Sequence, residues 1–183
     1  MSMLVKDANG TNVAIPGYDP CYRAGQIGLV PVASCTDLVT ITGSASGVVR
    51  VKSIKLGGVA TSAGSIRVEL IKRSTAGTGG TSTAPVAVPL DSASPAAGAI
   101  LAAYTANPTV GTIIGPIGAQ RIGLGVTLVG PVVWNQGWDF STRLDQPIVL
   151  RGVAQQLAIN LGGVTVPSGG VVDWEIEWEE GSA

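Results

Sequence analysis

The sequence predicts an all-β protein: an antiparallel β-sandwich of the jelly-roll type with about eight strands and an extended N-terminal arm. Three observations support this: strict apolar–polar alternation, turn residues between the alternating runs, and no sustained helical period. The clearest run is V-V-D-W-E-I-E-W-E at residues 171–179, where apolar residues alternate with four acids. A period of two places the two sets on opposite faces of a strand, so this run predicts a half-buried strand.

The N-terminal part, residues 1–35, shows no sustained period and is predicted to be an arm or irregular segment. Its turn-forming residues are Gly10, Pro16, Gly17, Pro20, Gly25, Gly28 and Pro31. Such an arm can lie along a neighbouring subunit, and a frayed terminus is equally compatible with the pattern. Residues 36–183 are predicted to form the sandwich domain.

The strand pattern begins at residue 36. The first run ends at a turn of small residues, 43–47, and the second carries alternating apolar residues that change phase by one position near Ser53. A slip of one residue in an otherwise regular strand is what a β-bulge produces. A third run alternates over residues 66–72.

The next segment, residues 74–111, is rich in Gly, Pro, Ser, Thr and Ala. A structureless connection of this length is unusual in a compact domain. A flexible insertion and an ordered crossing loop are the two alternatives. Its apolar residues are too frequent for a disordered linker, which favours an ordered loop with a short strand near Ile100–Thr105. The residues expected to pack are Val86, Val88, Leu90, Ile100, Leu101 and Tyr104.

The remaining runs complete the predicted sandwich. Residues 112–117 suggest an edge strand because Pro116 interrupts them, and residues 122–128 alternate strictly. Residues 147–151 and 156–161 flank a short turn and predict a hairpin.

The composition limits the function. The chain has 183 residues and no histidine, which excludes a Ser-His-Asp triad, a Cys-His pair and a three-histidine zinc centre. We therefore predict that it is not an enzyme and has no cofactor or metal. Charged residues make up only 13% of the chain, against roughly 25% in ordinary soluble domains. A surface so poor in charge is expected to be covered in part by other subunits, although small polar residues can also solvate it.

The few charges are unevenly distributed. Net charge is −1, which argues against a nucleic-acid binder, and no apolar run is long enough for a membrane helix. The pattern is compatible with solvated outer strand faces, or with a basic edge that meets the acidic strand of a neighbouring subunit. The candidate interface residues are Arg50, Lys52, Lys55, Arg67, Lys72, Arg73, Asp173, Glu175, Glu177 and Glu179.

Two further groups are candidate sites. Cys21 and Cys35 are expected to be free thiols, a bridge being the alternative outside the cytosol. The segment W-N-Q-G-W-D has the aromatic and polar groups of a sugar-binding site, or it covers one end of the core. A weaker possibility is that Asp139 and Asp145, near these tryptophans, are the two carboxylates of a glycoside hydrolase. The candidate glycan residues are Trp134, Asn135, Gln136, Trp138 and Asp139.

Several segments resemble small structural proteins of tailed bacteriophages. They are S-I-R-V-E-L-I-K-R-S-T-A-G-T-G-G-T-S-T-A-P (65–85), A-A-Y-T-A-N-P (102–108), L-R-G-V-A-Q-Q-L-A-I-N-L (150–161) and E-I-E-W-E-E (175–180). In this respect the chain is similar to the jelly-roll decoration, or cement, proteins of icosahedral heads. Residues 1–35 do not share in the resemblance.

The resemblance implies a structural virion protein that bridges neighbouring major capsid subunits and stabilises the capsid. Its partners would be the major capsid protein and copies of itself, as a trimer or dimer, without direct contact with nucleic acid or membrane. It would be made in the bacterial cytoplasm and act on the capsid exterior. The alternative is a tail, baseplate or fibre component with a glycan-binding β-sandwich.

Overall fold

The computed structural model describes residues 3–6, 12–15, 19–126, 136–141 and 146–181, and these form strands, turns and irregular segments. None of these residues forms a helix capable of crossing a membrane. The strands are β1 (Met3–Lys6), β2 (Asn12–Ile15), β3 (Cys21–Leu29), β4 (Asp37–Thr42), β5 (Val48–Ala60), β6 (Gly64–Arg73), β7 (Thr81–Thr83), β8 (Val88–Pro89), β9 (Ile100–Ala106), β10 (Ile113–Val126), β11 (Gln136–Asp139), β12 (Ile148–Arg151), β13 (Gln156–Asn160) and β14 (Val171–Gly181).

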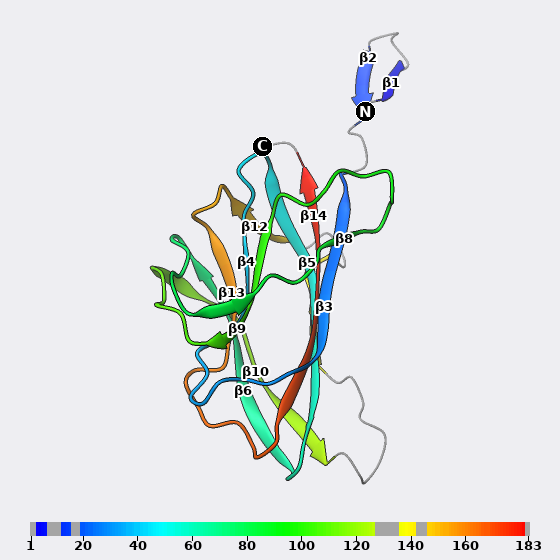
Figure 1. Cartoon of the computed structure of the whole chain (residues 1–183). Coiled ribbons are helices and arrows are strands. Elements are labelled where there is room, and N and C mark those ends of the chain that lie inside the picture. Colours follow the sequence, from blue (N-terminus) through cyan, green and yellow to red (C-terminus); the bar gives the residue numbers. More distant parts are fainter. Residues whose placement is uncertain (1–2, 7–11, 16–18, 127–135, 142–145, 182–183) are drawn as a thin grey trace.

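Most strands belong to one curled sheet that forms a half-barrel (Figure 1). Its order is β7-β9-β4-β13-β6-β10-β5-β14-β3-β8, and β11 and β12 also pair with β5. The all-β prediction is confirmed. The prediction of purely antiparallel pairing is wrong at one place, because Gly125 and Val126 of β10 run parallel to Val59 and Ala60 of β5. This contact links the two halves of the sheet, so they do not separate clearly into a two-sheet sandwich.

The core lies on the concave side of the curl, and β14 is central to it. Trp174, Ile176 and Trp178 are buried, whereas the acids between them are only partly covered. The ring of Trp178 stacks on Tyr22 of β3, with the centroids 5.8 Å apart. The half-buried strand predicted from the alternation of residues 171–179 is confirmed.

The predicted β-bulge near Ser53 is also confirmed. Along β14 and β5, Glu177 pairs with Ser53 and the next residue, Trp178, pairs with Val51. Lys52 is therefore the additional residue. The bulge lets Val51 and Ile54 both point into the core although three positions separate them.

The segment 74–111 is ordered, as predicted. β7, β8 and β9 all pair with the sheet, and β9 contains the short strand expected near Ile100–Thr105. Leu101 and Tyr104 are buried as expected. The other four residues expected to pack are exposed: Val86, Val88, Leu90 and Ile100.

Two strand predictions differ from the structure. The predicted hairpin of residues 147–151 and 156–161 is wrong, because β12 pairs with β5 whereas β13 lies between β4 and β6. The runs at 112–117 and 122–128 belong to one strand, β10, as far as the structure describes them, and its pairing with β6 is irregular around Gly115 and Ile117.

The predicted N-terminal arm contains two different structures. Cys21–Leu29, within the range predicted to be irregular, forms β3 and pairs with β14 in the main sheet. β1 and β2 form a separate two-stranded sheet. Figure 1 shows this hairpin beyond the end of the body at which β14 ends.

Candidate contact surface

The outer face of β5, β14 and β3 carries a ladder of opposite charges. Lys55 Nζ lies 2.9 Å from Glu175 Oε1, and Lys52 Nζ lies 3.7 Å from Glu179 Oε2. Arg23 on β3 pairs with Glu177. Because β14 lies in register between the two strands, three of the four acids predicted to meet another subunit, Glu175, Glu177 and Glu179, meet basic residues of their own chain.

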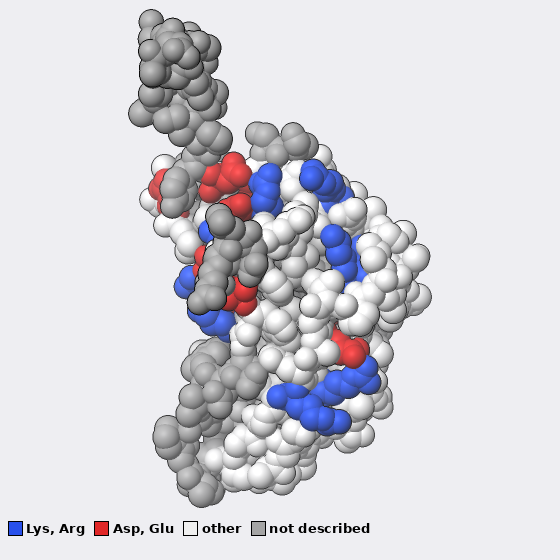
Figure 2. Space-filling view, turned by 180° about the vertical axis from the view of Figure 1, so that it is seen from behind, with Lys and Arg blue, Asp and Glu red and all other residues white. Residues whose placement is uncertain are grey.

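The other predicted interface residues lie in different surroundings. Arg50 pairs with Asp19 at 3.1 Å, and Asp173 accepts a hydrogen bond from the Gly28 amide at 2.7 Å. Arg67 pairs with Glu69 on the same strand. Lys72 is partly exposed on β6. Figure 2 shows these charges gathered in a few clusters, with broad uncharged areas between them.

Arg73 is the exception, because it is completely buried. Its Nη1 and Nη2 donate to Oδ2 and Oδ1 of Asp37 at 2.6 and 2.7 Å, and Nη1 also donates to Gln156 Oε1 at 3.0 Å. Asn160 Nδ2 donates to Asp37 Oδ1 at 2.8 Å. This cluster ties β4, β6 and β13 together. Gln156 Oε1 also accepts from the Gly77 amide, which fastens the 74–111 segment over the network.

The tryptophan segment is only partly described. Trp134, Asn135 and Asp145, and the side chain of Gln136, lie outside the described residues. Trp138 lies on β11 and packs against the core. Its indole covers Gly118, where an added Cβ would stand 2.6 Å from Trp138 Nε1. Asp139 Oδ1 accepts from the Ser141 amide and hydroxyl. For Trp138, the geometry therefore favours the covering role over a free sugar-stacking face.

Both cysteines are free thiols, as predicted. Cys35 is fully buried, and burial raises the pKa of its thiol to about 11. Cys21 is partly exposed, and burial is also the main cause of its raised pKa. Among the residues that the structure describes, no group of three or more Cys, Asp or Glu side chains is arranged to hold a metal ion.

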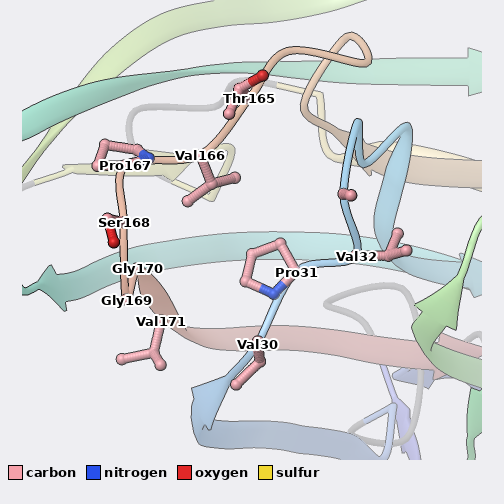
Figure 3. Close-up of a pocket in the computed structure, with 11 residues that line it drawn as sticks. Val30, Pro31, Val32, Thr165, Val166, Pro167, Ser168, Gly169, Gly170 and Val171 are labelled. Carbon is pink, nitrogen blue, oxygen red and sulfur yellow. The ribbon is translucent and has the colours of Figure 1, made fainter.

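An apolar hollow lies between the β3–β4 and β13–β14 connections (Figure 3). Its volume is about 350 Å³, and its lining runs through residues 30–33 and 165–171. Val30, Val166 and Val171 border the opening, whereas none of the lining residues is titratable. The hollow can accept an apolar side chain; its polar side-chain groups are the hydroxyls of Thr165 and Ser168, and none of the lining residues can act as a base to activate them.

A second hollow, of about 530 Å³, lies beside β3. Its apolar wall consists of Val86, Val88 and Leu90, which we call the apolar strip; they are 78%, 55% and 55% exposed. The sequence alone shows the alternation of these residues, but it does not show that they face solvent. Ile113, Ile114 and Ile117 of β10 form another exposed apolar group.

Comparison of the chain with known protein families, with curated proteins and with solved structures finds no match.

Proposed function

We propose that the chain is a structural virion protein of a tailed bacteriophage that decorates the capsid and cements neighbouring major capsid subunits. We also propose that the fold is related to a jelly roll, because the two halves of the curled sheet enclose one core. It assigns binding rather than catalysis to the protein.

The observation that carries the proposal is the nature of the exposed surface. Within the described part of the chain, twelve large apolar side chains are at least 38% exposed, among them the apolar strip. The charged ladder, in contrast, is paired within the chain. A surface with paired charges and exposed apolar groups favours contact with other proteins, since burying one such side chain contributes about 1.5–3 kcal/mol.

Cementing follows from mass action. A protein that binds only the assembled shell stabilises that shell relative to its separated subunits. A contact repeated over a symmetric surface adds to its neighbours through multivalency, so each copy can bind modestly and the shell still gains resistance to expansion.

The proposal is tested on purified heads that lack the protein. We expect such heads to release DNA at a lower temperature than complete heads, and added wild-type protein to restore the release temperature. Dye fluorescence during heating measures this release.

A charge placed in the apolar strip, Val88→Asp, should weaken the restoration. Thr83→Asp provides the matched control, because Thr83 is exposed on β7 at the opposite end of the sheet order. Equal release temperatures with and without the wild-type protein would rule out cementing. The glycan-binding alternative is not proposed, because Trp138 packs on Gly118 and the core.

A further inference from the structure

Among the residues that the structure describes, the N-terminal hairpin pairs with no other strand. β1 and β2 pair with each other, from Met3 opposite Ile15 to Lys6 opposite Asn12. Six of their eight residues are apolar: Met3, Leu4, Val5, Val13, Ala14 and Ile15. An isolated two-stranded hairpin is at best marginally stable in water. This hairpin therefore requires a surface outside its own two strands.

The body of the molecule has an unpaired strand edge. β8 covers β3 only at Tyr22 and Arg23, although β3 continues to Leu29. The carbonyl of Cys21 points toward β8, because it accepts a hydrogen bond from the Leu90 amide. Backbone groups of a strand alternate in direction, so the NH and CO of Gly25, four residues later, point to the same side. Within the described residues, no strand pairs with Ala24–Ile27 on this side. We call this edge the β3 slot.

The slot matches the hairpin in length and character. It is four residues long, as are β1 and β2. Ile27, at its end, is 81% exposed, and the apolar strip borders the hollow beside Ala24 and Gly25. Strand addition to such an edge supplies main-chain hydrogen bonds, and apolar side chains beside the edge add burial.

The position of the slot along β3 favours a hairpin from another copy. The slot begins ~10 Å beyond Cys21 along β3, at ~3.3 Å per residue. β8 occupies the edge between Cys21 and the slot, so the hairpin of the same chain would have to cross over β8. Copies also repel one another little, because the net charge is only −1.

We propose that the β1–β2 hairpin of one copy adds to the β3 slot of a second copy, with the apolar strip covering its apolar residues. Two copies can exchange hairpins reciprocally, or several can close a ring. Because this contact uses the apolar strip that Val88→Asp also alters, its test is made on the protein in solution, without capsids, and at positions outside the strip.

The test uses two full-length variants with complementary defects. Leu4→Asp damages the hairpin and leaves the slot intact, whereas Ile27→Asp damages the slot and leaves the hairpin intact. The Kd of self-association, from sedimentation velocity, should rise about tenfold or more for each variant alone, because both changes place a charge in an apolar contact. An equimolar mixture should re-form complexes, since it contains one intact hairpin and one intact slot.

Ile114→Asp is the control, because Ile114 is 61% exposed on β10, away from the slot, and its association should match wild type. Unchanged circular dichroism must accompany each loss of association. Three results would each overturn the proposal. They are a wild type that is monomeric at ~100 μM, a Leu4→Asp or Ile27→Asp variant that associates as strongly as wild type, and a mixture of the two variants that does not form complexes. A monomer whose Gly25 amide is protected from hydrogen exchange would assign the slot to its own hairpin or to another segment.

Discussion

The buried cluster around Asp37 predicts a large loss of stability from a single change of charge. Asp37→Asn keeps the size of the side chain but removes the negative charge that two guanidinium nitrogens of Arg73 contact at 2.6 and 2.7 Å. Both residues are fully buried, so no water replaces the lost partner. Arg73 would become a buried cation without a counter-charge.

The expected cost is about 3–5 kcal/mol in the free energy of unfolding, the range for removing one partner of a buried ion pair. The total free energy of unfolding of a domain of ordinary size is about 5–15 kcal/mol. At roughly 2–4 °C per kcal/mol for a chain of this size, Tm should fall by about 6–20 °C.

Urea unfolding followed by tryptophan fluorescence measures the loss directly, because Trp174 and Trp178 are buried and report on the core. Glu175→Gln is the matched carboxylate-to-amide control. Its partner Lys55 is half exposed, so this change should cost about 0–1 kcal/mol. If Asp37→Asn costs no more than Glu175→Gln, the buried pair does not hold β4 to β6 and the reasoning is refuted.

Three more predictions follow from single positions. Gly118→Ala should lower the free energy of unfolding in urea by about 1–3 kcal/mol, because the new Cβ meets the Trp138 indole. Gly123→Ala on the same strand should cost less, because an added Cβ there meets nothing within 4 Å. Equal costs for the two variants would contradict the contact. Burial raises the pKa of the Cys35 thiol from 9.0 to about 11, so above pH 9 the unfolded state loses the thiol proton whereas the folded state keeps it. The free energy of unfolding should therefore fall by about 2–3 kcal/mol as pH rises from 9 to 11. Cys35→Ala should remove this part of the pH dependence. At pH 8 a thiol reagent should modify partly exposed Cys21 well before buried Cys35, and both at the same rate in urea; equal rates in the folded protein would show that Cys35 is accessible.

Alternation predicted which residues face the core but not which strands become neighbours. The runs at 171–179 and around Ser53 were predictable because a period of two fixes the buried face. The partners of β12 and β13 were not, because the turn at Gly152 carries the chain from one half of the curled sheet to the other. β3 gave little signal because Gly25 and Gly28 interrupt its apolar positions.

The candidate site shows the same division. Lys55 and Glu175 were both candidates for contact with a neighbouring subunit, and only the register of β14 on β5 shows that they meet within one chain. Arg73 was a candidate interface residue and was therefore expected at the surface. Its burial comes from the 74–111 segment, which packs over the outer face of β6 through Gly77. No periodicity in β6 itself contains this information.

The position of β14 in the sequence determines when the nascent chain can complete its fold. Residues 171–181 form a central strand, between β5 and β3, and supply two of the tryptophans on which the interior is built. A nascent chain consequently cannot complete its interior until the ribosome has translated and released this segment. Products of premature termination would leave long edges of β5 and β3 unpaired, and such edges promote aggregation. A chain that lacks β14 therefore exposes the two strand edges that β14 otherwise pairs.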